Sequence, residues 1–226
     1  MIKGVFITGT DTGVGKTYVA TGIAKALRSA GLDAGVMKPA ETGCGSRAGK
    51  LIPRDAEALI RAAAVRDSLS LVNPYRFRSP VAPSVASAIE RKPIDPEKIL
   101  KAFKMLSQRH RFMVVEGAGG IMVPLAEGYL FLDLAEAIGL PAVIVARPGL
   151  GTINHTLLTI EALRGRGLTI AGIVINDGQG ERKGLAETTS PAVIEGISGV
   201  PIIATIGHRS RAFGDLVKNI GCDSGG

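Results

Sequence analysis

The sequence predicts an α/β protein: a mostly parallel sheet with helices on both faces, in a single domain that spans residues 1–226. Short apolar runs bounded by Gly or Pro alternate along the chain with segments of helical periodicity. This alternation is typical of parallel strands joined by crossover helices. The length of 226 residues suffices for one large core, and neither an internal repeat nor a low-complexity segment divides the chain.

The elements follow from these two patterns in chain order. The predicted strands are the apolar runs Gly4–Thr8, Ala34–Met37, Phe112–Val115, Ala142–Ala146, Ile170–Ile175 and Ile202–Ile206. The predicted helices are the periodic segments Lys16–Ala30, Asp55–Ala64, Pro96–Gln108, Leu130–Ile138, Thr152–Arg164 and Ser190–Ile197. The proline-containing stretch VNPYRFRSPVAPS is interpreted as an ordered connection inside the domain.

The composition favours a cytoplasmic protein without a membrane anchor. Hydrophobic residues make up 46% of the chain, yet no apolar run approaches the ~18 residues of a transmembrane helix, and the N-terminus does not resemble a signal peptide. Cys44 and Cys222 lie far apart without metal-ligand spacing, which favours free thiols. The net charge of +7 is spread along the chain, so we expect small anionic ligands rather than a nucleic acid.

The segment GTDTGVGKT leads from the first predicted strand into the first helix. Backbone N–H groups between Thr12 and Thr17, the helix N-terminus and Lys16 together suit a polyphosphate. GKT matches the end of the phosphate-loop pattern G-x-x-x-x-G-K-[ST], but Thr10 stands where the first Gly belongs. The order of strand, loop and helix still favours a nucleotide site on a P-loop NTPase-like fold over a merely structural glycine turn.

Acidic and basic residues follow other predicted strands at the same sheet edge. Thr17 offers a hydroxyl to Mg²⁺, and Glu116, at the end of a buried strand in FMVVEGAGG, is a candidate ligand or simply a turn cap. Asp55 begins a helix, where capping preference alone would also favour an acid. Lys38 and Thr42, in VMKPAETG, follow the second strand, so Lys38 is either a second cation for bound phosphate or an ordinary surface lysine.

Six segments, GTDTGVGKT, KPAETG, RDA, VNPY, VEGAGG and GTINH, occur in an order and at spacings that resemble the dethiobiotin synthetase family over almost the whole chain. The resemblance implies an ATP-dependent cyclo-ligase of biotin biosynthesis. Such an enzyme closes a ring from 7,8-diaminopelargonate and CO₂, and releases dethiobiotin, ADP and phosphate. It also implies Mg²⁺ as cofactor and a homodimer with active sites at the interface.

The same resemblance implies a role for individual residues. It casts Lys38 as the catalytic lysine, with Lys16 and Thr12 beside the reacting groups, and implies Mg²⁺ ligands at Thr17, Asp55 and Glu116. The implied substrate contacts are Thr42 and, from the neighbouring subunit, Leu150, Gly151 and Asn154. The implied nucleotide contacts are Gly13, Val14, Gly15, Lys16, Thr17, Tyr18, Asp55, Glu116, Gly117, Ala118, Gly119, Asn176 and Asp177, with Asn176 at the adenine.

One departure from the family pattern leaves the choice of nucleotide open. Gly207, in ATIG, stands where members often carry a Pro that shapes the base pocket, and the short basic segment after His208 has no assigned contacts. Three other classes stay possible: a partitioning or cluster-assembly switch ATPase, a cobyrinate-type amidotransferase synthetase domain, and a nucleotide-binding scaffold without turnover. The switch ATPases carry a second lysine where this loop has Asp11, and the amidotransferases are usually joined to a glutaminase domain.

Overall fold

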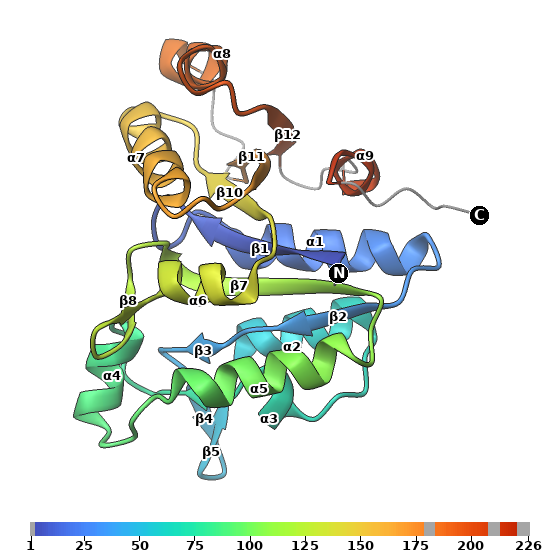
Figure 1. Ribbon diagram of the computed structural model, residues 1–226, viewed down its shortest axis with the longest axis vertical. Helices are drawn as coiled ribbons and strands as arrows, with labels where there is room; N and C mark the ends of the chain where they lie inside the picture. The colour runs from blue at the N-terminus through green and yellow to red at the C-terminus, as the bar shows by residue number, and fades with distance from the viewer. Residues whose placement is uncertain (1–2, 179–183, 208–212, 221–226) are drawn as a thin grey trace.

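A six-stranded parallel sheet forms the centre of the computed structural model, which describes residues 3–178, 184–207 and 213–220 (Figure 1). The strand order is β12-β11-β10-β1-β7-β2. The strands are β1 Lys3–Gly9, β2 Ala34–Met37, β7 Phe112–Gly120, β10 Ala142–Ala146, β11 Ile170–Asp177 and β12 Ile202–Gly207. All six predicted strands are thus confirmed, and most of their apolar residues are buried because helices cover both faces, although those of the edge strand β12 are mostly half-buried.

Helices cover the two faces of the sheet in the arrangement that parallel crossovers require. One face carries α1 Lys16–Ser29 and α2 Arg54–Ala63, with α9 Phe213–Asn219 against α1. The other face carries α5 Pro96–Ser107, α6 Phe131–Ile138 and α7 Thr152–Arg164, with α8 Leu185–Ser198 against α7. Figure 1 shows α5, α6 and α7 in front of the sheet and α1 and α2 behind it.

Short elements fill the long connection between β2 and β7 and the one after β7. They are β3 Ala40–Glu41 paired with β6 Tyr75–Arg76, β4 Gly45–Arg47 paired with β5 Lys50–Ile52, β8 Pro124–Ala126 paired with β9 Tyr129–Leu130, and helices α3 Leu69–Val72 and α4 Pro83–Ile89. None was predicted, because two to seven residues are too few for a clear periodicity. The stretch VNPYRFRSPVAPS is ordered as expected, since it contains β6 and the start of α4.

Several predicted boundaries were wrong by a few residues. β7 continues to Gly120 because the backbone of GAGG still pairs with β1, where Gly9 lies opposite Gly120. Helix α8 begins at Leu185 and accommodates Pro191 in its interior, whereas the sequence predicted a start at Ser190. Helix α2 begins one residue early at Arg54, so Asp55 lies inside the first turn and Pro53 occupies the N-cap.

The sheet and its helices enclose one continuous hydrophobic core. Within the described residues, no helix combines the length and the apolar character that crossing a membrane requires. Cys44 is a buried free thiol, and burial raises its pKa to about 11; Cys222 and His208 lie outside the described residues. The carboxyl ends of β1, β7 and β2 lie side by side, which brings their following loops to one edge of the sheet.

Candidate active site

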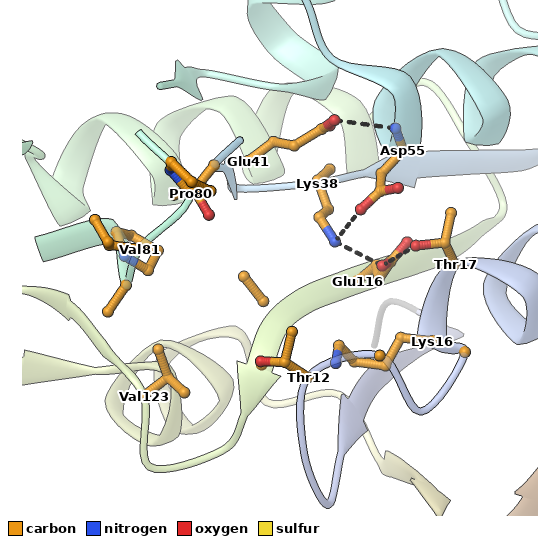
Figure 2. A pocket seen from close by; sticks show the side chains of 17 residues that line it. Thr12, Lys16, Thr17, Lys38, Glu41, Asp55, Pro80, Val81, Glu116 and Val123 are labelled. Atoms are coloured by element: carbon orange, nitrogen blue, oxygen red, sulfur yellow. Dashed lines mark hydrogen bonds and ion pairs between the residues drawn. The ribbon is translucent and has the colours of Figure 1, made fainter. Parts of the chain in front are cut away.

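A cleft of about 600 Å³ opens at the carboxyl ends of β1, β7 and β2 (Figure 2). Many of the residues predicted from the sequence line it: Thr12, Gly13, Gly15, Lys16, Thr17, Lys38, Thr42, Asp55, Glu116, Ala118 and Gly119. They come from four separate segments of the chain. The position agrees with the general rule that parallel α/β sheets bind ligands at the carboxyl ends of their strands.

The loop between β1 and α1 has the conformation of a phosphate loop. Gly13 and Gly15 have φ angles of 78° and 92°, which residues with a side chain rarely adopt. A Cβ atom at Gly15 would also collide with the amide of Asn176. Gly15 is the N-cap of α1, so the helix begins directly at Lys16 and its free N–H groups face the loop.

Lys16 is buried within this loop, and its ammonium donates a hydrogen bond to the main-chain oxygen of Asp11 at 2.9 Å. Burial and the nearby charge of Lys38 lower the pKa of Lys16 to about 8. An anionic ligand would reverse this effect, because a negative charge nearby favours the protonated amine. The loop therefore presents a desolvated cation beside helix N–H groups, an arrangement that suits phosphate.

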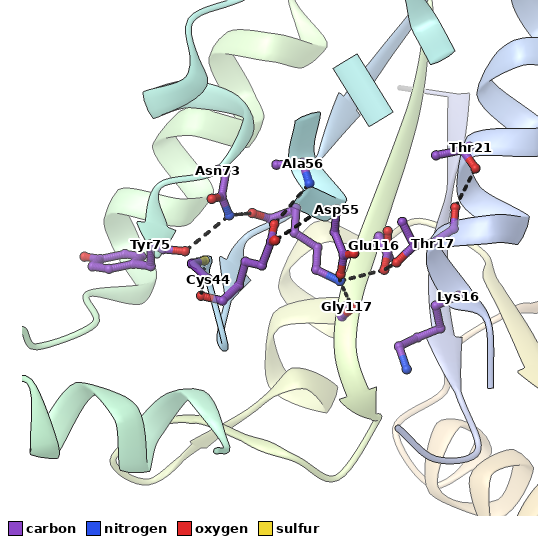
Figure 3. A network of polar contacts seen from close by, with 12 residues as sticks. Lys16, Thr17, Thr21, Cys44, Asp55, Ala56, Asn73, Tyr75, Glu116 and Gly117 are labelled. Atoms are coloured by element: carbon purple, nitrogen blue, oxygen red, sulfur yellow. Dashed lines mark hydrogen bonds and ion pairs between the residues drawn. The ribbon is translucent and has the colours of Figure 1, made fainter. Parts of the chain in front are cut away.

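A chain of polar contacts links Lys38, labelled in Figure 2, to two acids and to the start of α1 (Figure 3). The Lys38 ammonium lies 2.6 Å from Glu116 Oε1 and 3.1 Å from Asp55 Oδ2. Thr17 Oγ1 donates to the same Glu116 oxygen at 2.7 Å. Lys38 also donates to the carbonyl oxygen of Gly117 at 3.2 Å. Residues that are up to 99 positions apart in the sequence thus meet in one network.

Lys38 is not an ordinary surface lysine, because only 3% of it is exposed. Burial alone would lower the pKa of Lys38, but the charges of Glu116 and Asp55 outweigh burial and raise it. Glu116 is fully buried, and its Oε2 has no hydrogen-bond partner among the described residues. The cleft therefore contains a charged lysine with two carboxylates, one of which has an oxygen free to bind a further group.

The oxygen atoms of this network fit a magnesium ion. Mg²⁺ prefers hard oxygen ligands, and one or two carboxylates are typically completed by phosphate oxygens and water. Thr17, Asp55 and Glu116 offer such oxygens beside the phosphate loop, and the unpartnered Glu116 Oε2 is one of them. The donor set is thus of the kind that binds Mg²⁺ together with a nucleotide.

The opposite wall of the cleft was not predicted from the sequence. It is formed by Pro80–Pro83, which are apolar except for their backbone, and by the carboxylate of Glu41, while Val123, also not predicted, lies on the side of Thr12. Burial raises the pKa of Glu41, although hydrogen bonds from the backbone amides of Ala56 and Asp55 oppose this shift. Short elements of the β2–β7 connection bring Glu41 and Pro80–Pro83 to the cleft, and the turn after β7 brings Val123.

The predicted substrate residues of the neighbouring subunit do not line this cleft. Leu150, Gly151 and Asn154 lie at the start of α7, beyond β10, and Leu150 is 92% exposed. Gly151, with a φ of 86°, is the N-cap of α7 and supplies no side-chain cap to the helix. The first turn of α7 contains no acidic residue.

The predicted adenine residue Asn176 and two further predicted nucleotide contacts, Asp177 and Tyr18, do not line this cleft. Asn176 Nδ2 donates to the carbonyl of Val14 at 2.9 Å, and Asn176 Oδ1 is buried without a partner among the described residues. Asp177, at the end of β11, lines a neighbouring cavity of about 270 Å³ beside β12 and α8. Tyr18 lies on the outer side of α1, where its ring packs edge-on against Phe213.

Comparisons with known proteins agree with this geometry. A model of the AAA domain family matches residues 3–211. The ATP-dependent dethiobiotin synthetase of Thermodesulfovibrio yellowstonii is 42% identical over 224 residues, which cover 96% of this chain and 93% of that protein. The corresponding enzyme of Anaeromyxobacter dehalogenans is 44% identical over 221 residues, 96% of this chain and 97% of the relative.

Solved structures establish the fold independently. The cell division ATPase MinD of Pyrococcus furiosus superposes with a TM-score of 0.58 at 17% identity, and covers 97% of this chain and 98% of its own. At this identity the likeness shows a shared P-loop fold and no shared activity. The sequence relatives are far more similar and cover nearly the full length. The chain therefore belongs to the AAA domain family and to the family of ATP-dependent dethiobiotin synthetases.

Proposed function

We propose that the cleft at the ends of β1, β7 and β2 is where this enzyme uses ATP to close the ring of dethiobiotin from 7,8-diaminopelargonate and CO₂. The observation that carries the proposal is the meeting of Lys16, Lys38, Thr17, Asp55 and Glu116 beside an apolar wall. A switch ATPase needs the phosphate site alone. A carboxylase needs a second space next to the γ-phosphate, and the region between Lys38 and Val123 supplies it.

The chemistry explains why the site holds cations rather than a general base. Addition of CO₂ to one substrate amine gives a carbamate and releases one proton. The carbamate oxygen takes the γ-phosphoryl group of ATP, and ADP leaves. The second amine then attacks the resulting carbamic-phosphoric anhydride, and the ring closes as phosphate departs and takes up the proton that this amine loses. Lys16 and Lys38 stabilise the negative charge that spreads over the transferring oxygens, while the fixed walls align the reacting atoms.

We assign Thr17, Asp55 and Glu116 to a Mg²⁺ ion that accompanies ATP. When bound there, the ion supplies positive charge to the phosphate oxygens. Glu116 can bind it through Oε2 while Oε1 keeps its contacts with Thr17 and Lys38. Lys38 keeps the two acids from repelling each other before the nucleotide enters.

We assign the base of ATP to the cavity beside β11 and β12. The unpartnered Asn176 Oδ1 suits a donor such as an exocyclic amino group. Asp177, Thr188 and Thr205 line the cavity with polar groups, and Asn176 precedes Asp177 at the end of β11. Asn176 also donates a hydrogen bond to the phosphate loop, so it ties the end of β11 to that loop.

The aliphatic chain of the substrate fits the apolar wall, and its distal carboxylate needs a further anion site. We propose that the start of α7 of a second subunit supplies this site in a homodimer, through Leu150, Gly151 and Asn154. The helix begins at a glycine, has no side-chain cap and carries no acid in its first turn, so its N–H groups suit a carboxylate. Because these residues do not line the cleft of their own chain, a second copy is needed to bring them there.

The partners of the enzyme are then small molecules, namely ATP, CO₂ and the diamine. A buried free thiol at Cys44 suits a reducing compartment, which supports a cytoplasmic location. The positive net charge of +7 favours the approach of anionic substrates.

The proposed function is tested by measuring ADP release and dethiobiotin formation in parallel, with diaminopelargonate and bicarbonate added separately and together. We expect stoichiometric ADP and dethiobiotin only when both are present. ADP release at the same rate without the diamine would instead indicate a switch ATPase, and no ADP release under any condition would indicate a scaffold.

A further inference from the structure

Glu41 is a buried carboxylate whose partners are the first backbone amides of helix α2. Its Oε1 accepts a hydrogen bond from Asp55 N and its Oε2 from Ala56 N, both at 3.0 Å. Only 6% of Glu41 is exposed, although it lines the cleft. Figure 2 shows its side chain reaching across to Asp55 on the far side of Lys38. Each carboxylate oxygen thus fixes one of two successive amides.

Helix α2 depends on this contact because it has no cap of its own. Its N-cap residue is Pro53, whose side chain accepts no hydrogen bond. The first N–H groups of a helix need an acceptor from elsewhere, and a carboxylate is favoured there by the helix dipole. Glu41 meets this need from 14 residues earlier in the sequence.

The backbone of Glu41 is itself held in the segment that carries Lys38. Glu41 belongs to β3, and its carbonyl accepts a hydrogen bond from Phe77 N at 2.9 Å. Three residues earlier, the carbonyl of Lys38 accepts one from Asn73 Nδ2, and Lys38 N donates to the carbonyl of Val72 (Figure 3). The segment from Lys38 to Glu41 is therefore fixed at both ends.

We propose that Glu41 is a positioning residue that fixes Asp55 relative to Lys38 and Glu116, and so sets the geometry of the metal site. This inference rests on the proposed role of Asp55 as a Mg²⁺ ligand. A helix start held at two successive amides cannot rotate freely, so the Asp55 side chain leaves the backbone in a defined direction. Without Glu41, the first turn of α2 loses its hydrogen-bond acceptor, and the backbone of Asp55 is no longer held in one position.

The test compares Glu41→Gln and Glu41→Ala with Asp95→Ala as matched control. Asp95 also accepts a backbone N–H at a helix start, from Glu97 N at 2.9 Å, but it caps α5 and does not line the cleft. All three variants weaken one helix N-terminus, so their melting temperatures report the shared structural cost. Mn²⁺ serves as the probe: its binding to the enzyme with ADP is followed by the electron paramagnetic resonance signal of the free ion.

We expect Glu41→Ala to weaken Mn²⁺ binding about tenfold, as is usual when a residue that orients a ligand is removed. Glu41→Gln retains one acceptor oxygen and should lose less, and Asp95→Ala should bind Mn²⁺ as the wild type does. The amide proton signals of Asp55 and Ala56 should move and exchange faster in both Glu41 variants.

Three outcomes would overturn the inference, and the last is distinguishable from the first two. If the amide signals of residues 55 and 56 move but Mn²⁺ affinity is unchanged, or if Asp95→Ala weakens Mn²⁺ binding equally, Glu41 is only a helix cap. If Asp55→Asn also leaves Mn²⁺ affinity unchanged, the proposed metal role of Asp55 fails, and the inference fails with it.

Discussion

At the scale of single residues, the position of Lys38 decides how charge is balanced in the cleft. Its ammonium lies between two carboxylates, within 2.6 Å of Glu116 and 3.1 Å of Asp55. A buried cation with such partners is strongly held. Removal of the lysine or of the acids leaves the remaining buried charge without a partner. The Lys38 ammonium is thus placed to exchange its ion pairs with the two acids for an ion pair with a phosphoryl group when that group binds.

We predict that Lys38→Met lowers kcat for dethiobiotin formation by about a hundredfold or more, in line with the loss of one preorganised charge in a transition state. ADP affinity should be largely retained, because Lys16 and the loop amides, which we propose bind the phosphates, are unchanged in this variant. Steady-state kinetics and calorimetric ADP titrations measure the two effects separately.

Lys50→Met is a suitable control for this substitution, because Lys50 is an exposed lysine on β5. It should leave both kcat and ADP affinity at the wild-type values. Because Lys38→Met leaves Glu116 buried without its cation, its melting curve must show a folded protein at the assay temperature. A folded Lys38→Met enzyme with normal turnover would remove Lys38 from the mechanism.

At the scale of elements, an ionic cluster fastens the amino ends of β2 and β7 to the loop after α2, far from the cleft. His110 precedes β7, and its ring nitrogens lie 2.9 Å from Asp33 and 2.7 Å from Asp67. Asp67 also accepts a hydrogen bond from Arg109. Burial alone would lower the pKa of His110, but the two acids outweigh burial and raise it. Burial would raise the pKa of Asp67, but His110 and Arg109 lower it.

These directions predict how the stability of the protein depends on pH. Because the pKa of His110 is raised on folding, its contribution to stability is complete below the unfolded-state pKa of about 6.5. This contribution is lost as the pH rises through the pKa of the folded state. Because the pKa of Asp67 is lowered on folding, its contribution to stability is present above the unfolded-state pKa of about 3.9. This contribution is lost as the pH falls through the pKa of the folded state. The cluster should therefore stabilise most between roughly pH 4 and 6.5.

The variant His110→Gln should show this window as a difference in melting temperature from the wild type. We expect the gap to be larger at pH 6 than at pH 9, by roughly 2–4 °C if the cluster contributes about 1 kcal/mol. Arg61→Gln, which removes an exposed pair with Glu57, is the control and should give no such dependence. A gap that is equal at both pH values would mean that His110 acts through packing alone.

The ends of β11 and β12 carry the second element-scale prediction. Gly207 pairs with Asp177 at the edge of the sheet, and a Cβ atom there would meet nothing within 4 Å. The proposed base cavity, which Asp177 and Thr205 line, therefore has no side chain from Gly207 beside it, and a pocket discriminates strongly only when its walls are rigid. We predict that kcat/KM for at least one other nucleoside triphosphate is comparable with that for ATP.

Gly207→Pro should then raise kcat/KM for ATP relative to kcat/KM for the other nucleotide. Gly207→Ala, which adds only a methyl group, should change this ratio less. Competition assays with pairs of nucleotides give the ratio directly. A strong ATP preference in the wild type would contradict the prediction.

At the scale of the whole molecule, composite active sites would make two inactive variants complement each other. Lys38→Met disables the cleft, and Asn154→Asp places a negative charge where the distal carboxylate is proposed to bind. In a mixed dimer, both changes fall in one site and the other site is intact. Equal mixing with subunit exchange should therefore restore about a quarter of the wild-type activity. Activity that does not recover would mean that each site is built from one chain.

Most of the sheet and the phosphate side of the cleft could be predicted from the sequence for one physical reason. Strands buried on both faces form continuous apolar runs, and the polar residues that follow them must gather at one edge. Thr17, Lys38 and Glu116 were found in this way. Which partners these side chains contact could not be predicted. Whether Lys38 is buried between acids depends on how α2 packs, because α2 carries Asp55.

The wall opposite the phosphate loop could not be predicted. Glu41 lies on a two-residue strand, which shows no periodicity, and its partners are backbone amides that carry no sequence signal. Pro80–Pro83 are brought to the cleft by α4, a helix of seven residues. Interactions of this kind become visible only when tertiary packing is known.

The strand order also determines when the phosphate loop can form during synthesis. Strand β1 is made first, yet its neighbours in the sheet are β7 and β10, which end at Gly120 and Ala146. At about 5–20 residues per second, a ribosome needs on the order of ten seconds to add the intervening chain. Throughout that interval the nascent β1 has two unpaired edges, and the nucleotide loop that follows it lacks the neighbouring strands that support it in the folded protein.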